Sequence, residues 1–298
     1  VCYRSWMSTT RPDLGLCLAG GGNRAFWQLG LLEVLGEDVM PRVRAISACS
    51  AGAAAAVFLA SDRIEAGRST FAKYRRGIAK NFDATRLLRG ERPLPHENVY
   101  RTTLREAIGE SGLEHLRSRP YPIRILAAEP PARLGGALGV AAGLAAYQLE
   151  KLARPTVLHP TLAPRLGFRA HVHDARECAS LDELIDLVLA SSASPPITKP
   201  GRHAGKSLLD GSLVDNAPAF VLDDEEGVRR TLVLLTRPYP PSATGRRGRR
   251  LYLAPTEPVP AHRWDYRENA PIDETLELGR RDAERHRERL EEFLRESV

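Results

Sequence analysis

Three short motifs in this sequence contain the residue types that acyl-transfer chemistry requires. The first is a glycine run followed by a basic residue, Gly20, Gly21, Gly22, Asn23 and Arg24. Glycines let backbone N–H groups approach a ligand closely, and the N-terminus of a following helix adds positive potential there. This motif therefore predicts a site for an anion or an oxyanion.

The second motif places a serine among small residues. It reads Ala48, Cys49, Ser50, Ala51 and Gly52. A sharp turn from a strand into a helix presents the central hydroxyl and needs small neighbours, as in the G-x-S-x-G elbow, here with alanine in place of the first glycine. The alternative is a serine that caps an alanine-rich helix. Ser50 is the candidate nucleophile, and we expect Cys49 to be a small buried residue.

The third motif is Asp210, Gly211 and Ser212, which follows a short apolar run. An aspartate at a strand end can direct its carboxylate across the sheet edge toward a distant residue, although Asp-Gly alone indicates only a turn. A serine nucleophile needs a neighbouring base, and its oxyanion needs preorganised donors. Together the three motifs supply all of these parts.

The elements that must position these motifs follow from the pattern of apolar residues. Runs typical of buried strands cover residues 14–19, 42–47, 123–128, 207–209 and 231–235, and helical patterns cover residues 25–35, 51–60, 99–111 and 181–192. This alternation predicts an α/β layered sheet in a single domain over residues 1–298. Proline, glycine and arginine at 238–260 predict a surface loop, and the charged pattern at 272–297 predicts a C-terminal helix with Leu276, Leu290 and Phe293 turned inward.

The order and spacing of the motifs resemble the patatin-like phospholipase family. The serine follows the glycine run by about 30 residues, and Asp-Gly lies far downstream. Just before it, residues 190–195 (ASSASP) resemble that family's A-S-x-A-x-P stretch. The resemblance spans roughly residues 14–218. It implies a three-layer α/β/α fold with a mostly parallel central sheet, and it implies a serine lipid acyl hydrolase.

The same resemblance implies a role for each matching residue. Ser50 would attack the ester carbonyl, and Asp210 would accept its proton as the only base of a dyad. The backbone amides of Gly20, Gly21 and Gly22 would hold the oxyanion, and Arg24 would brace the glycine loop. Ala51, Gly52 and Gly211 would support the two turns. No cofactor is implied, and the substrate would be a lipid or a smaller ester, with a membrane surface as a peripheral contact.

Three alternatives remain open. Gly20, Gly22 and Ala25 also satisfy a dinucleotide-binding fingerprint, but the second strand runs into Ser50 where an acidic residue should hold the ribose. A Ser-Asp-His hydrolase would draw its histidine from His262 or His286. A non-catalytic lipid-binding protein of the same fold would have no need of both Ser50 and Asp210.

Bulk composition narrows the function classes. The chain has 298 residues, 43% hydrophobic and 27% charged, with a net charge of +6, as in an ordinary globular protein. The arginines at 246–250 lack interleaved aromatic residues, so we expect no nucleic acid partner. The four cysteines have no disulfide or zinc spacing, and residues 1–10 show no signal peptide, so we expect a cytoplasmic protein.

Two further segments of the sequence could form functional features, a metal pair and a lid. His171 and His173 lie on one face of an extended segment, as a metal pair would, but no third ligand is evident, so no metal site is predicted. Residues 135–152 have little charge and come before the aspartate motif, where an insertion would overhang the strand ends. They form either a buried core helix or a lid that lies on a lipid surface.

Overall fold

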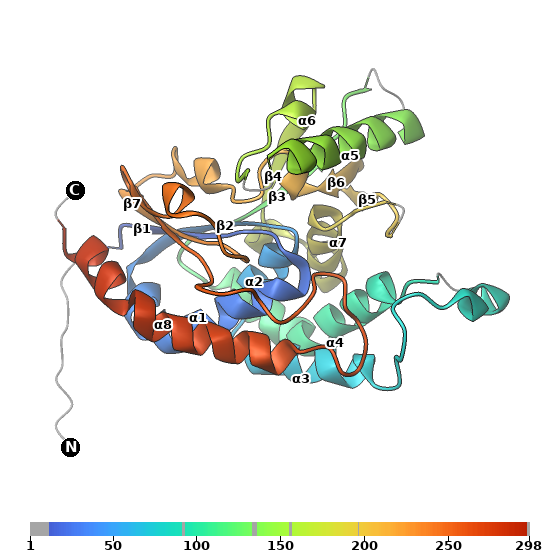
Figure 1. Cartoon of the computed structure of the whole chain (residues 1–298), viewed down its shortest axis with the longest axis horizontal. Coiled ribbons are helices and arrows are strands. Elements are labelled where there is room, and N and C mark those ends of the chain that lie inside the picture. The colour runs from blue at the N-terminus through green and yellow to red at the C-terminus, as the bar shows by residue number, and fades with distance from the viewer. Residues whose placement is uncertain (1–11, 91–92, 133–135, 155–156, 196, 297–298) are drawn as a thin grey trace.

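A mixed sheet runs through the protein (Figure 1), as seen in a computed structural model that describes residues 12–90, 93–132, 136–154, 157–195 and 197–296. Its strands are β1 (Leu14–Leu18), β2 (Val43–Cys49), β3 (Ile123–Glu129), β4 (Arg169–Asp174), β5 (Gly201–His203), β6 (Lys206–Asp210), β7 (Arg230–Leu234), β8 (Gly245–Arg247) and β9 (Arg250–Leu253). Within the described residues their order is β5-β6-β3-β2-β1-β7-β9-β8, and β4 also pairs with β3.

Five neighbouring strands, β3, β2, β1, β7 and β9, run parallel to one another. The pairs β3–β4, β3–β6, β5–β6 and β8–β9 are antiparallel. Every residue of β1 is buried, which is typical of a parallel strand covered on both faces. Leu18 pairs with Ala48, so the carboxyl ends of β1 and β2 bring the glycine run and Ser50 to the same edge of the sheet.

Helices cover the sheet. They are α1 (Phe26–Val39), α2 (Ala51–Ala60), α3 (Ile64–Arg75), α4 (His96–Arg117), α5 (Gly136–Ala153), α6 (Leu162–Arg165), α7 (Leu181–Ser191) and α8 (Ile272–Arg295). Figure 1 shows α1 to α4 and α8 together on one side, with α5 and α6 on the other. The main apolar core joins α1, α2, α4, α7 and α8 to the parallel strands. The predicted α/β/α fold with a mostly parallel central sheet is confirmed.

The C-terminal helix α8 lies along α1, and Leu276, Leu290 and Phe293 are buried as predicted. The two helices touch at glycines. A Cβ atom added to Gly30 would lie 2.1 Å from the carbonyl oxygen of Leu276, and one added to Gly279 would lie 2.2 Å from that of Trp27. The indole Nε1–H of Trp27 also donates to the buried carboxylate of Asp282 at 2.9 Å. Close backbone approach therefore determines how these helices pack.

The surface loop predicted for residues 238–260 is wrong in part, because β8 and β9 lie within it. Leu251 and Leu253 of β9 are buried in the main core, whereas Tyr252 joins the core on the opposite face of the sheet. The alternating run is only three residues long and is flanked by arginines, glycines and prolines, so its strand character is masked in the sequence. Pairing with β7 makes it a strand.

We predict that Gly30→Ala and Gly279→Ala each lower the free energy of unfolding by about 1–3 kcal/mol, because a methyl group would force α1 and α8 apart. Gly36→Ala is the matched control in α1, since nothing lies within 4 Å of its added Cβ atom. That variant should gain about 0.5–1 kcal/mol from helix propensity. Urea denaturation measures all three. Equal effects of Gly30→Ala and Gly36→Ala would show that the close approach is unimportant.

Candidate active site

Ser50 lies at a sharp turn between β2 and α2, with φ 53° and ψ −133°. Among the described residues other than glycine, it shares a positive φ only with Asp62 and Ala204. This conformation is strained for a residue with a side chain and needs support from its surroundings. The N–H of Ser50 donates to both the carbonyl oxygen (3.1 Å) and the Oγ (2.8 Å) of Ser191. The Oγ of Ser191 donates in turn to the carbonyl of Leu126 at 2.6 Å.

The small residues around Ser50 let α2 begin directly against β1. A Cβ atom on Gly52 would lie 2.3 Å from the carbonyl oxygen of Leu18, so any side chain there would push the helix away. Ala48 is fully buried in the sheet, and Ala51 lines a cavity beside Ser50. This geometry is that of a nucleophile elbow, with alanine sufficing at position 48.

The structure brings Ser50 and Asp210 together across 160 residues of sequence. The Oγ of Ser50 donates to the Oδ2 of Asp210 at 2.8 Å, and both residues are buried. Asp210 ends β6, and its Oδ1 accepts the N–H of Ser212 at 2.8 Å, a backbone contact that does not depend on the side chain at 212. A Cβ atom on Gly211 would lie 2.3 Å from the carbonyl oxygen of Leu126, so glycine permits this turn to sit against β3.

The glycine run forms a loop beside Ser50. The N–H of Gly20 donates to the carbonyl of Asn216 at 2.9 Å, and its own carbonyl accepts the hydroxyl of Thr236 at 2.8 Å. The Gly20 amide is therefore already engaged, which corrects the expectation that all three glycine amides face an oxyanion. Gly21 and Gly22 line the cavity that contains Ser50 and Asp210, and they remain as the candidate donors.

Gly22 needs to be glycine for two reasons. Its φ is +59°, and a Cβ atom would lie 2.2 Å from the carbonyl oxygen of Arg263. Arg24 braces the loop, since its Nε donates to the carbonyl of Gly21 at 3.2 Å. Burial and the nearby charges of Arg263 and Arg237 lower the pKa of Arg24 to about 10. Three arginines thus concentrate positive charge beside the glycine loop.

Two cavities meet at Ser50. The first holds about 620 Å³ of empty space, part of it open to solvent, and is mostly apolar, with Leu29, Ala54, Phe58 and Phe71 in its walls. The second holds about 1080 Å³, also partly open to solvent, and is lined by Asp210, the glycine loop and the three arginines. An ester bond held at Ser50 would therefore have the apolar cavity on one side and the polar cavity on the other.

The family model described as patatin-like phospholipase matches residues 16–223. The chain belongs to this family. Membership supports hydrolysis of lipid acyl esters as the general class of activity. Among solved structures, the chain is similar to VipD from Legionella pneumophila, with 14% identity and a TM-score of 0.41. That match covers 90% of this chain and 66% of the other. No curated protein sequence matches.

His262 and His286 were the two candidates for the histidine of a Ser-Asp-His triad. Both lie away from Ser50 and Asp210 in this patatin-like protein. The Nε2 of His286 is 2.9 Å from the carbonyl oxygen of Ala254, and the exposed His262 accepts the N–H of Trp264 at 3.3 Å. Neither lines a cavity that contains Ser50. Neither His262 nor His286 is therefore placed to complete a Ser-Asp-His triad. Membership of the patatin-like family also argues against the dinucleotide-binding alternative.

Helix α5 covers one wall of the second cavity. Leu144 and Tyr147 line this cavity and pack on the cluster formed by Ala128, Ala163, Phe168, Leu209 and Leu213. Glu150 ties the end of α5 to α6, because its carboxylate accepts the N–H groups of Thr161 and Leu162 at 2.8–2.9 Å. The opposite side exposes 62% of Leu149 and 79% of Leu152. The segment 135–152, of which residue 135 lies outside the described residues, thus combines a packed face with an exposed apolar one.

Two supporting residues of the patatin-like site were missed in the sequence. Ser191 holds the strained turn at Ser50, and its only signal is its place in the A-S-x-A-x-P stretch. Thr236 holds the glycine loop from the end of β7, and no motif marks it. Both act through backbone groups of residues that are distant in sequence.

Proposed function

We propose that the protein is a serine lipid acyl hydrolase that cleaves carboxylic esters through a dyad of Ser50 and Asp210. The observation that supports this most directly is the 2.8 Å hydrogen bond from the Ser50 hydroxyl to the Asp210 carboxylate, at a strained turn beside a glycine loop. A serine activated by a base within hydrogen-bond reach is the arrangement that covalent acyl transfer requires.

In the proposed reaction, the Oγ of Ser50 attacks the ester carbonyl while the Oδ2 of Asp210 accepts its proton. The carbonyl oxygen becomes an oxyanion that the N–H groups of Gly21 and Gly22 stabilise, each donor contributing about 3 kcal/mol. When the tetrahedral intermediate collapses, Asp210 returns the proton to the departing alcohol. Water then attacks the acyl-serine with the same base, which releases the fatty acid and regenerates Ser50.

The two cavities suggest how a lipid would lie. The acyl chain would occupy the apolar cavity beside Ala54 and Phe58, because burying each methylene group contributes about 0.8 kcal/mol. The alcohol portion would occupy the polar cavity, where Arg24, Arg237 and Arg263 favour an anionic head group. This arrangement supports a phospholipid over an uncharged glyceride.

Contact with a lipid surface would occur through α5. No helix among the described residues is long and apolar enough to cross a bilayer. Leu149 and Leu152 are exposed on the helix that walls the polar cavity. Their insertion at the boundary between head groups and acyl chains would bring the cavity to its substrate.

We predict that Ser50→Ala and Asp210→Asn each lower kcat/KM for a chromogenic short-chain ester by at least about a thousandfold, because the two residues act as one unit. Both variants should keep the wild-type circular dichroism spectrum. His262→Asn is the control and should stay within about twofold of wild type. A serine-directed phosphonate, followed by mass spectrometry, should label Ser50. Activity retained in Asp210→Asn would rule out the dyad.

A second prediction concerns the apolar cavity. Ala54→Leu partly fills it, so kcat/KM should fall at least about tenfold for long acyl chains and stay within about twofold for an acetyl ester. Ala84→Leu, at an exposed site, is the control and should leave the chain-length profile unchanged. A uniform loss across all chain lengths in Ala54→Leu would mean that the acyl chain does not enter this cavity.

A third prediction concerns α5. The double variant Leu149→Asp, Leu152→Asp should lower hydrolysis of anionic phospholipid vesicles at least about tenfold, because burying a leucine side chain contributes about 1.5–3 kcal/mol. Hydrolysis of a short-chain ester and the melting temperature should change little, since both side chains are exposed. Leu88→Asp, at an exposed leucine outside α5, serves as the control. Parallel loss of both activities would refute surface binding through α5.

A further inference from the structure

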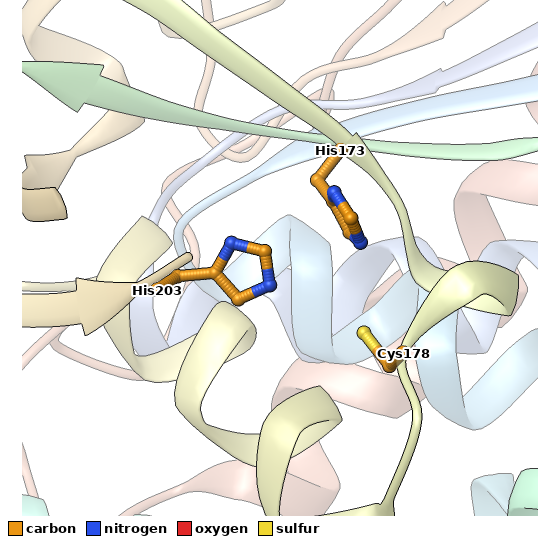
Figure 2. A group of neighbouring side chains, drawn as sticks. All are labelled: His173, Cys178 and His203. Atoms are coloured by element: carbon orange, nitrogen blue, oxygen red, sulfur yellow. The ribbon is translucent and has the colours of Figure 1, made fainter. Parts of the chain in front are cut away.

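Three residues of types that bind metals, two histidines and one cysteine, meet at a site separate from the serine and its cavities. His173, Cys178 and His203 each direct one donor atom toward the others, and these atoms all lie within 4.8 Å of one another. Figure 2 shows the two imidazole rings and the thiol turned toward a common centre. The sequence offered no third ligand for the His171 and His173 pair, because His203 lies about 30 residues downstream, on another strand.

Each member is held by a different element. His173 belongs to β4, where it pairs with Ile125. Cys178 follows the turn after that strand, and its carbonyl accepts a hydrogen bond from Arg117. His203 ends β5 at a two-residue hairpin, where Ala204 and Gly205 both have positive φ. Such a turn aligns the two strands tightly.

Strand β5 is pressed against α7, which places His203 deep in the protein. A Cβ atom on Gly201 would lie 2.2 Å from the Cα atom of Ala190, so the strand and the helix are in backbone contact. The side chain of His203 is only 1% exposed. Cys178 is also buried, and it forms no disulfide within the part of the chain that the structure describes.

The buried ring nitrogens are not satisfied by protein groups. Among the described residues, the Nε2 atoms of His173 and His203 have no hydrogen-bond partner, and the Oε1 of Glu183 stays 3.6 Å from that of His203. The Nδ1 of His203 lies 3.4 Å from the Nε2 of His171, a contact that orients the ring and leaves Nε2 directed at the cluster. Buried polar atoms almost always have a partner, so these two facing imidazoles are suited to share a ligand such as a metal ion.

We propose that His173, Cys178 and His203 bind a zinc ion, with Glu183 as the fourth ligand. One thiolate and two imidazoles are a donor set that suits zinc, which binds nitrogen at about 2.0–2.1 Å and sulfur at about 2.3 Å. Two ligands of a tetrahedral zinc are then about 3.3–3.7 Å apart, so the three side chains need to close only slightly. On binding, the Cys178 thiol releases its proton to solvent and the thiolate joins the metal.

Glu183 is the carboxylate next to His203 at this centre, and it would move toward the ion to bind it. Its Oε1 lies 3.6 Å from the Nε2 of His203, and its Oε2 accepts the N–H of Ala179 at 2.6 Å. The hydroxyl of Ser180 caps α7 by accepting the N–H of Glu183, and the Ala179 contact holds the Glu183 side chain at the residue before that cap. Glu183 can therefore give Oε1 to the metal while Oε2 keeps its contact with Ala179.

The proposed ion has a structural role. It joins the edge strand β4, the start of α7 and the β5–β6 hairpin, and no ligand lines a cavity that contains Ser50. Four protein ligands close the coordination sphere, as in structural zinc sites. The same elements hold Ser191 at the end of α7 and Asp210 at the end of β6, so the ion would stiffen the half of the sheet that presents the base.

The test uses the full chain, stripped of metal with a chelator and titrated with Co²⁺ as a spectroscopic substitute for zinc. We expect a single equivalent to bind with a thiolate-to-cobalt charge-transfer band and the intense visible bands of a tetrahedral site. Zinc should displace the cobalt and raise the melting temperature of the stripped protein. A folded wild-type protein that gives no thiolate band would overturn the proposal without any variant.

Variants assign the ligands. Cys178→Ser and His203→Ala should each weaken cobalt binding by more than about a hundredfold, since even outer partners of metal ligands contribute about 10- to 100-fold. Glu183→Gln keeps an acceptor for the N–H of Ala179 and should weaken binding while retaining the thiolate band. His115→Ala, an exposed histidine on α4, is the control. Phosphonate labelling of Ser50 checks that each variant is folded, and unchanged cobalt affinity in folded Cys178→Ser would exclude the site.

Discussion

The left-handed backbone of Ser50 is the constraint on which the rest of the site depends. A strained residue persists only where its neighbours hold it, and here the neighbours come from four directions. Ser191 accepts the Ser50 N–H twice, Gly52 lets α2 start against the end of β1, and Asp210 accepts the hydroxyl. The glycine loop lies against the same turn. The order of parallel strands β3, β2 and β1 makes all these contacts local in space although they are distant in sequence.

Residues that act through their own side chains or through a local turn could be predicted from the sequence. Ser50, Asp210, Gly22 and Gly52 each sit in a short motif whose chemistry is readable, and the strands before them are apolar runs. Residues that act through a distant backbone could not be predicted: Asn216 engages the Gly20 amide, and Thr236 the Gly20 carbonyl, from other elements. Strand β9 was missed for a related reason, because its three apolar residues become a strand only by pairing with β7.

His171, His173 and His203 illustrate the same limit on what can be predicted from the sequence. Spacing by two on a strand correctly suggests that His171 and His173 share a face, but only the antiparallel hairpin at Ala204 and Gly205 brings His203 to them. Strained backbone thus serves two different purposes within the described residues. At Ser50 the strain presents a hydroxyl to a cavity, and at Ala204 it turns a strand so that an imidazole faces inward.

The pairing of α1 with α8 has a consequence for how the protein reaches its native state. These helices are separated by more than two hundred residues, and the buried Trp27 on α1 finds its hydrogen-bond partner on α8. During synthesis α1 emerges long before α8, so Gly30 and the indole of Trp27 stay uncovered until α8 leaves the ribosome. Such non-local contacts slow folding and prolong the exposure of apolar surface. The glycine loop, which leads directly into α1, would therefore gain its final rigidity only after α8 has packed against that helix.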